Sequence, residues 1–300
     1  MTEPGAKSPA PESGSRVWLA FAGCSAIWGS TFLVISLGND ALAPVWASAV
    51  RLVLASVLLL VWCLAARIPL PRGAALKAAL IFGVLNFGLN MPLLYWGEKR
   101  APSGLSAVMF STTPLTTALL ARFFGMESLS PRKILGALIA LSGVCLLFSD
   151  SLHGVLSASG LAAVFAAAVA AAIGATLYKR GPRQSSVAAN AVACAVGAVF
   201  AFAGSFALRE SHALPLTVAA LLPLLYLTVA GSLGAFVLFT WLVARWPVSR
   251  ASYIGVVVPL IAMTLGSVVR HEPFTATIGA GSALVIAGLV TGMGGAKTAH

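Results

Sequence analysis

Residues 28–32 read Trp-Gly-Ser-Thr-Phe, and residues 173–177 read Ile-Gly-Ala-Thr-Leu, so a glycine and a threonine recur 145 positions later. The same spacing holds without a gap as far as residue 288. It links Trp96 with Trp241, Pro102 with Pro247, Pro114 with Pro259, Glu127 with Glu272, Gly136 with Gly281, and Gly143 with Gly288. In a strongly apolar chain, such a duplication is typical of a transporter whose substrate path lies between the repeats.

The composition places the chain in a membrane. Apolar residues make up 59% of the 300 residues and charged residues only 9%, and the mean hydropathy is +0.96. A spanning helix needs about 20 mostly apolar residues. Ten such runs follow one another: 17–37, 43–66, 75–96, 102–123, 132–149, 159–179, 186–207, 217–242, 247–269 and 274–294. The sequence therefore predicts an all-α integral membrane protein with ten transmembrane helices, which leaves no room for a soluble catalytic domain.

The number of spans per repeat sets the arrangement of the halves. Five is odd, so the second copy must enter the membrane from the opposite side, and the repeats are inverted. We expect a disordered cytoplasmic tail over residues 1–16, a first repeat over 17–149, a linker over 150–158, a second repeat over 159–294, and a cytoplasmic tail over 295–300. Because the linker is short, the halves should form one packed unit.

The net charge of +11 does not indicate nucleic acid, because the basic residues are scattered through short loops. If the N-terminus is cytoplasmic, fourteen Lys and Arg residues fall on the inner side. Four fall on the outer side: Lys99, Arg100, Arg209 and Arg270. This bias follows the positive-inside rule. We therefore expect a multi-pass protein of the cell (inner) membrane with both termini in the cytoplasm.

Several short motifs of the repeat point to a known family. They are residues 28–32, Arg51 with Leu52, Pro114, residues 125–130 (Gly-Met-Glu-Ser-Leu-Ser), and the glycines 136 and 143. In this order and spacing the chain resembles the EamA unit of the drug/metabolite transporter superfamily over about residues 17–292. The second copy departs from it at Ile173, which replaces Trp28, and at Val196, which replaces Arg51. The resemblance implies two inverted five-helix repeats, peripheral fifth and tenth spans, and transport, often export, of amino acids, other metabolites or drugs.

Polar and aromatic residues within the spans are the candidate substrate contacts. Asn86 and Asn90 share one helix face and either bond to neighbouring helices or line a cavity. Trp28 lies mid-span, so an interfacial aromatic belt does not explain it. The candidate set is Trp28, Ser30, Thr31, Arg51, Asn86, Asn90, Tyr95, Ser111, Thr112, Thr176 and Tyr253. We place the site between the first, third, fourth, sixth, eighth and ninth spans.

Arg51 is the charged residue that lies well inside an apolar span. A central charge is costly in a membrane, so it should face a partner or a wet cavity. One interpretation is that its guanidinium holds a substrate carboxylate or phosphate. The other is that it reaches the outer face and ties helix ends or loops together.

Two further repeated pairs have two interpretations each. Pro114 and Pro259 each remove a backbone donor within a span, so they are either hinges for alternating access or static kinks. Glu127 and Glu272 lie in loops just before a helix, where an acid meets the positive end of the helix dipole. We interpret them as structural loop acids, with direct transport chemistry as the alternative.

Several classes of site are missing from the sequence. No phosphate-binding Gly-rich loop is present, and Cys24, Cys63, Cys145 and Cys194 lie in four different spans without metal-ligand spacing. We expect these cysteines to be buried, and we expect neither a metal nor a cofactor. No Asp, Glu or His lies deep within a span, so facilitated flow is at least as plausible as proton exchange.

The partners we expect are a small-molecule substrate and the lipid bilayer. The Ala-rich spans 159–179 and 186–207, and the glycines at 288 and 292, favour close helix packing, either within the chain or at a homodimer seam. We therefore predict an exporter of small organic metabolites. An importer of a similar metabolite, a membrane scaffold and an intramembrane enzyme are the alternatives, and the enzyme lacks the required nucleophile with a base or metal cluster.

Overall fold

The computed structural model describes residues 14–100, 106, 110, 113–126, 130–147, 158–270 and 276–293, and all regular elements in these ranges are helical. The first repeat contains α1 (Gly14–Ala41), α2 (Pro44–Ala65), α3 (Gly73–Phe82), η1 (Gly83–Leu89), α4 (Asn90–Glu98), α6 (Thr113–Phe123) and α7 (Pro131–Leu147). The second contains α8 (Ala158–Arg180), α9 (Ser186–Ala207), α10 (Val218–Tyr226), η3 (Leu227–Ala235), α11 (Phe236–Arg245), α12 (Val248–Ala251), α13 (Ile254–Arg270) and α14 (Ala276–Met293).

Each expected apolar run overlaps at least one of these helices. Six helical stretches are long and apolar enough to cross a membrane: Gly14–Ala41, Pro44–Ala65, Gly73–Glu98, Ala162–Arg180, Ser186–Ala207 and Val218–Arg245. Within the described residues, α6, α7, α13 and α14 do not reach the same length and hydropathy. The described residues therefore form an all-helical fold with six candidate membrane spans, whereas the count of ten spans stays a prediction.

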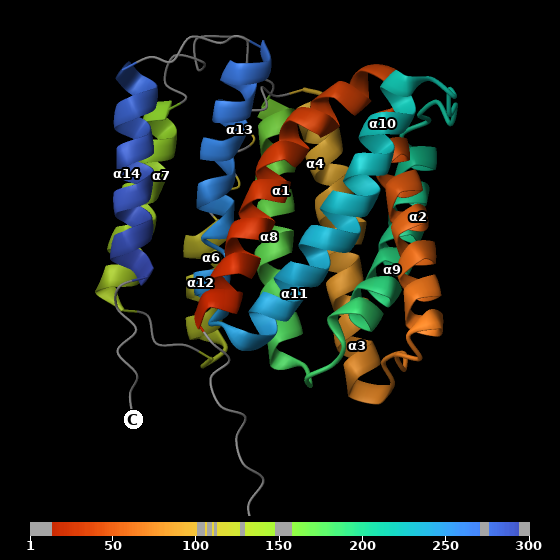
Figure 1. Cartoon of the computed structure of the whole chain (residues 1–300), viewed down its shortest axis with the longest axis horizontal. Helices are drawn as coiled ribbons and strands as arrows, with labels where there is room; N and C mark the ends of the chain where they lie inside the picture. The colour runs from red at the N-terminus through yellow and green to blue at the C-terminus, as the bar shows by residue number, and fades with distance from the viewer. Residues whose placement is uncertain are drawn as a thin grey trace, which may run out of the picture.

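The helices of the two repeats run in opposite directions (Figure 1). In that view α1 rises from the lower edge of the molecule, whereas α8, its counterpart 145 residues later, descends toward it. Each of these two helices packs on helices of the other repeat: α1 packs on α11 and α13, and α8 packs on α4 and α6. The first and second halves therefore interlock rather than stand side by side.

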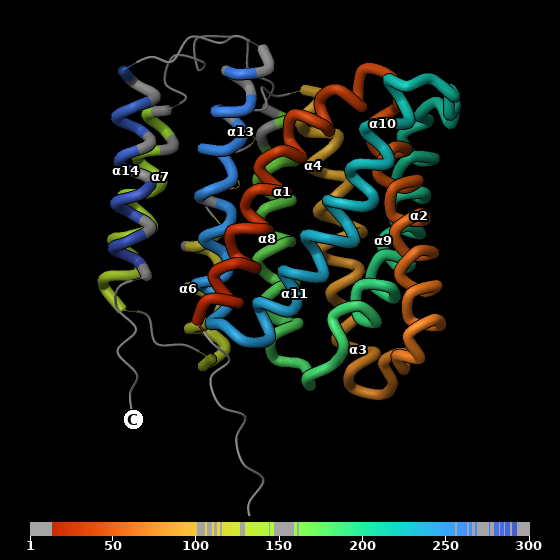
Figure 2. The backbone as a smooth tube through the Cα atoms, in the orientation of Figure 1, coloured from red at the N-terminus to blue at the C-terminus, as the bar shows by residue number. Residues whose placement is uncertain are grey.

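Two helix pairs close the ends of the bundle. At one end α2 packs on α9, and at the other α7 packs on α14 (Figures 1 and 2). The α7–α14 pair is in close backbone contact, since a Cβ added to Gly136 would lie 2.6 Å from the Cα of Gly292. The small residues of the last span thus serve packing within the chain, and the peripheral place of these two helices agrees with the EamA resemblance.

One long helical stretch in each repeat is interrupted by a π-helical segment, and the two segments lie at equivalent positions. The segment η1 joins α3 to α4, and η3 joins α10 to α11. π-Helical turns are rare, and they occur frequently at functional sites. The hydropathy of the sequence did not predict them, because a change from i+4 to i+5 bonding leaves the run of apolar residues unbroken.

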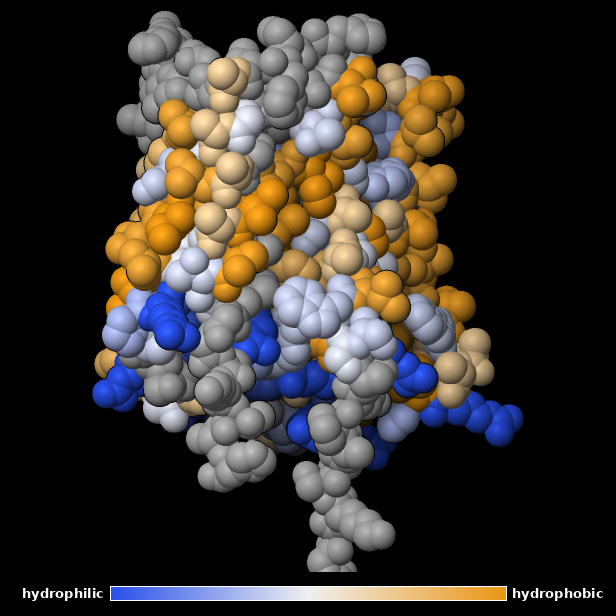
Figure 3. Space-filling model, turned by 60° about the vertical axis from the view of Figure 1, so that its left-hand side comes forward, coloured by the Kyte–Doolittle hydropathy of each residue, from blue (hydrophilic) through white to orange (hydrophobic). Residues whose placement is uncertain are grey.

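The surface separates into an apolar flank and a charged end. In Figure 3 hydrophobic residues cover the side of the molecule, and strongly hydrophilic residues gather at the lower end. The same end holds the beginning of α1 and the end of α14 (Figure 1). Trp96 and Trp241 each stack under an arginine, with the Arg100 and Arg245 Cζ atoms 3.8 and 4.1 Å from the ring centroids. Such amphipathic pairs suit membrane–water interfaces.

Candidate functional site

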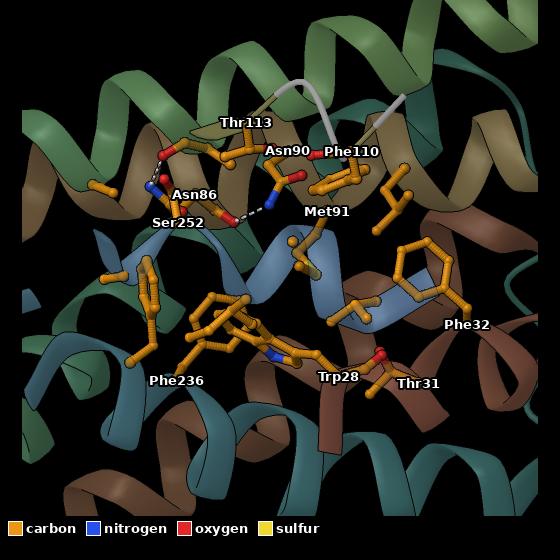
Figure 4. A pocket seen from close by; sticks show the side chains of 18 of the residues that line it. Trp28, Thr31, Phe32, Asn86, Asn90, Met91, Phe110, Thr113, Phe236 and Ser252 are labelled. Carbon is orange, nitrogen blue, oxygen red and sulfur yellow. Dashed lines mark hydrogen bonds between the residues drawn. The ribbon is translucent and has the colours of Figure 1, made fainter. Parts of the chain in front are cut away.

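A cavity of about 100 Å³ lies between the two repeats (Figure 4). Its walls come from α1, α2, the η1–α4 stretch, Phe110, the first part of α6 (Thr113 and Thr117), α8, α11 and the α12–α13 stretch. A single enclosed water needs roughly 10–15 Å³, so the space suits a small organic molecule rather than a polymer. Because both halves line it, any movement of one repeat against the other changes its shape.

One wall of the cavity is aromatic. The ring of Trp28 lies 5.0 Å from that of Phe236 and 5.1 Å from that of Phe239, centroid to centroid. We did not select the two phenylalanines from the sequence. Their counterparts 145 residues earlier, Met91 and Leu94, also line the cavity, but these residues are apolar as well, so the repeat gave no signal that would have selected the phenylalanines.

Two amides stand on another wall. Figure 4 shows the side-chain nitrogen of Asn90 directed at the carbonyl oxygen of Asn86, at 3.3 Å. The Asn86 side-chain nitrogen donates in turn to the Ala171 carbonyl oxygen of the other repeat, at 3.4 Å. The Asn90 side-chain oxygen is buried, and no described residue donates to it. Asn90 therefore presents a free acceptor in the cavity lining.

Arg51 supplies the charge in the described lining of the cavity. Its side chain is buried, with only 2% of the residue exposed. The Nε atom donates to the Ser232 hydroxyl at 2.8 Å, and Nη1 donates to the Tyr95 hydroxyl at 2.9 Å. No carboxylate oxygen of the described residues lies within 4.0 Å of the guanidinium. The cation is thus held between two neutral hydroxyls, not at the outer surface.

Comparison with known families identifies the fold. The EamA-like transporter family matches residues 16–149 and again residues 158–291, once for each repeat. The chain belongs to this family. The resemblance seen in the repeat motifs is thereby confirmed, and the protein is a membrane transporter rather than an enzyme.

Individual relatives agree with this assignment. The chain is 30% identical over 247 residues to the uncharacterized inner membrane transporter YedA of Escherichia coli (strain K12), which covers 80% of this chain and 78% of that protein. It is 27% identical over 266 residues to a probable terminal-alkyne amino-acid exporter of Streptantibioticus cattleyicolor, covering 88% of each chain. A solved structure described as "Crystal structure of protein" has the same fold, with a TM-score of 0.75, 19% identity, and coverage of 93% of this chain and 97% of that one.

Some of the predicted site residues line the cavity, and others do not. Trp28, Thr31, Arg51, Asn86 and Asn90 line it. Four others stand behind or away from the described lining. The Ser30 hydroxyl bonds the Tyr226 hydroxyl, Tyr95 holds Arg51, the Thr176 hydroxyl donates to the Ala172 carbonyl oxygen, and the Tyr253 hydroxyl donates to the Lys133 carbonyl oxygen.

Other predictions fall partly or wholly outside the described residues. Ser111, Thr112, Glu127 and Glu272 are among the undescribed positions, so their roles stay predictions. Pro259 is buried inside α13, and Pro114 is buried in the first turn of the described part of α6. Their use as hinges also stays a prediction.

One carboxylate is more enclosed than its sequence position indicated. Glu98 is the last residue of α4, eight positions after Asn90 on the same helix face. Both of its carboxylate oxygens are buried, and no described residue forms a hydrogen bond with them. Glu98 does not belong to the described lining of the cavity.

Proposed function

We propose that this EamA transporter exports a small organic metabolite, such as an amino acid, by alternating access between its inverted repeats. The observation that carries the proposal is the cavity between the repeats, which is lined by both of them and combines one aromatic wall with one arginine and two amides. A small molecule with polar and apolar parts fits such a lining. Rocking of one repeat against the other would open the cavity to either side of the membrane in turn.

We further propose ten transmembrane helices, with both termini in the cytoplasm of an inner-membrane protein. The gathering of hydrophilic residues at the end where α1 begins and α14 ends supports this orientation. The four shorter helices fall in sequence runs that are long enough to span when the neighbouring residues of each run are counted.

Export rather than import is supported by the relative from Streptantibioticus cattleyicolor, which is described as a probable terminal-alkyne amino-acid exporter. A homodimer also stays a proposal, and it would need a seam other than the small residues of α14, because these pack on α7.

Transport by the purified carrier in liposomes tests the proposal. Vesicles loaded with unlabelled amino acids and other small metabolites, one at a time, are diluted into the labelled compound, and counterflow is measured. We expect accumulation of label for at least one compound, and none in protein-free vesicles. Counterflow for no compound would contradict the proposed function. Efflux from inverted and right-side-out cell vesicles then separates export from import.

A further inference from the structure

We propose that the cavity binds its substrate through a single carboxylate held by Arg51, so that the transported molecule is a monocarboxylate with an apolar body. The inference rests on the proposed transport function and adds the class of substrate. It starts from a charge that the described protein leaves without a counter-ion.

Arg51 is a buried cation to which the described residues offer no counter-ion. The residue is 2% exposed, and its two hydrogen bonds go to the neutral hydroxyls of Ser232 and Tyr95. A buried charge without a partner of opposite sign is costly in a membrane protein, so such residues face substrate or ion pathways. A substrate anion in the adjoining cavity would supply the partner.

The Arg51 guanidinium has N–H donors that form no hydrogen bond with a described residue. Arginine carries five N–H donors, and the described structure uses one at Nε and one at Nη1. The Nη2 atom makes no hydrogen bond with a described residue. It lies against η3, where a Cβ added to Gly231 would stand 2.7 Å from it and 3.3 Å from the Thr31 methyl carbon. Thr31 lines the cavity, so the unused donors stand at its edge, where a carboxylate can accept two of them.

The rest of the cavity favours one negative charge on an apolar body. Arg51 is the one cation in its described lining. A phosphate group carries a charge of about −1.5 to −2 near neutral pH and would remain partly uncompensated, whereas a carboxylate matches a single guanidinium. Trp28, Phe236 and Phe239 provide an apolar surface for the remainder of the molecule.

A matched set of probes tests the inference on the unaltered carrier. The probes are 3-phenylpropanoate, its isosteric amide 3-phenylpropanamide, and 2-phenylethylphosphonate, titrated into the purified protein with binding followed by calorimetry. We expect the carboxylate to bind roughly tenfold or more tightly than the amide, the range expected for a charge-assisted hydrogen bond. A carboxylate that binds no better than the amide, or not at all, would overturn the proposal. Tighter binding of the phosphonate than of the carboxylate would show that the cavity prefers a dianion, and this result would also overturn the proposal.

Two glycines of η3 give a matched pair of variants that retain Arg51. In Gly231→Ala the new methyl group displaces the movable end of the guanidinium, whereas in Gly234→Ala the nearest atoms are at an ordinary 3.6 Å. We expect Gly231→Ala to lose most of the carboxylate preference and Gly234→Ala to keep it. Arg51→Gln should abolish the preference if the variant folds, as judged by gel filtration. Equal preference in Gly231→Ala and Gly234→Ala would assign Arg51 a structural role only.

The two proposals fail in different ways. If the liposome screen finds counterflow only of compounds that have no carboxylate group, the carboxylate inference is wrong and the transport function stands. If it finds no counterflow for any compound, the proposed function itself is wrong.

Discussion

At the residue scale, the two halves differ at one pair of equivalent positions, 86 and 231. A Cβ added to Gly174 in α8 would lie 1.9 Å from the Asn86 side-chain nitrogen. At the position 145 residues after Asn86 the chain has Gly231, and the space beside this glycine is taken by the Arg51 guanidinium. At these two equivalent positions, one repeat therefore has an amide side chain and the other has a glycine whose neighbouring space holds a cation.

Two lining residues lead to the first prediction. Trp28→Ala removes an aromatic face, and Asn90→Ala removes the free acceptor in the cavity. Each is expected to lower the transport rate about tenfold, because a ligand contact worth a single good interaction is lost. Initial rates in liposomes are compared at equal amounts of folded carrier. Trp62→Ala serves as the control, since Trp62 is 46% exposed on the outer surface of α2. Normal transport by both cavity variants would contradict the assigned path.

Glu210 leads to a stability prediction. Its carboxylate accepts hydrogen bonds from the backbone nitrogens of Val45 and Trp46, at 3.2 and 2.8 Å, and so caps α2 from the opposite repeat. Glu210→Ala is expected to lower the free energy of unfolding by about 1–2 kcal/mol, seen as a lower melting temperature in detergent. Glu210→Gln keeps one acceptor oxygen, so its free energy of unfolding should lie between that of the original carrier and that of Glu210→Ala. A Glu210→Ala carrier as stable as the original would show that this cap contributes nothing.

At the element scale, the closest helix contact is that of α7 with α14. A Cβ on Gly288 would lie 2.4 Å from the Ala140 backbone nitrogen and 2.6 Å from the Gly136 carbonyl oxygen. Backbone atoms cannot move aside as a flexible side chain can. The absence of side chains at these two glycines is therefore what allows the pair to form, as in other small-residue membrane interfaces.

This contact predicts opposite signs for two glycine-to-alanine changes. Gly288→Ala should destabilise the carrier, because the helices must separate, and the melting temperature should fall. Gly23→Ala should leave it unchanged or raise it slightly, because the nearest atom is at 3.5 Å and alanine favours a helix over glycine by up to about 1 kcal/mol. Equal effects of the two changes in the same detergent would argue against close packing of α7 on α14.

At the scale of the whole molecule, inversion places equivalent loops at opposite ends. Ala66 follows α2, and Ser211, 145 residues later, follows α9. Both are exposed, and Figure 1 shows the α2–α3 connection at the lower end and the α9–α10 connection at the upper end. The pair therefore reports the orientation of the carrier in the membrane.

We predict that an impermeant thiol reagent applied to intact cells labels Ser211→Cys but not Ala66→Cys. The native cysteines are replaced by alanine first. This step is needed because Cys145 is exposed on α7, contrary to our expectation of burial, whereas Cys24, Cys63 and Cys194 are buried. Equal labelling of both positions in intact cells would contradict the inverted topology, and the reverse pattern would place the termini outside.

The last prediction concerns energy coupling. No Asp, Glu or His belongs to the described lining of the cavity, so an imposed pH gradient should not drive accumulation. The test uses a transported amino acid whose charge is constant between about pH 6 and pH 8, in liposomes with and without the gradient. Gradient-driven accumulation that disappears in Glu98→Gln, Glu127→Gln or Glu272→Gln would assign proton coupling to that residue.

Much of the architecture could be predicted from the sequence because the relevant signals are one-dimensional. Run length, charge bias and the 145-residue spacing predicted a helical membrane protein of two inverted repeats, with Arg51, Asn86, Asn90 and Trp28 as polar or aromatic residues needing an explanation. Each of these signals depends on position along the chain and on the side of the membrane, which the order of residues fixes directly.

Only the tertiary structure decided which side chains share the cavity. Phe236 and Phe239 entered it, Tyr95 became a support for Arg51, and Thr176 turned back onto its own helix. The physical reason is that lipid is as apolar as a protein core. A lipid-facing and a cavity-facing phenylalanine therefore look alike in the sequence, and their direction is set by helix rotation, by the π-helical segments and by contacts between residues far apart in the chain.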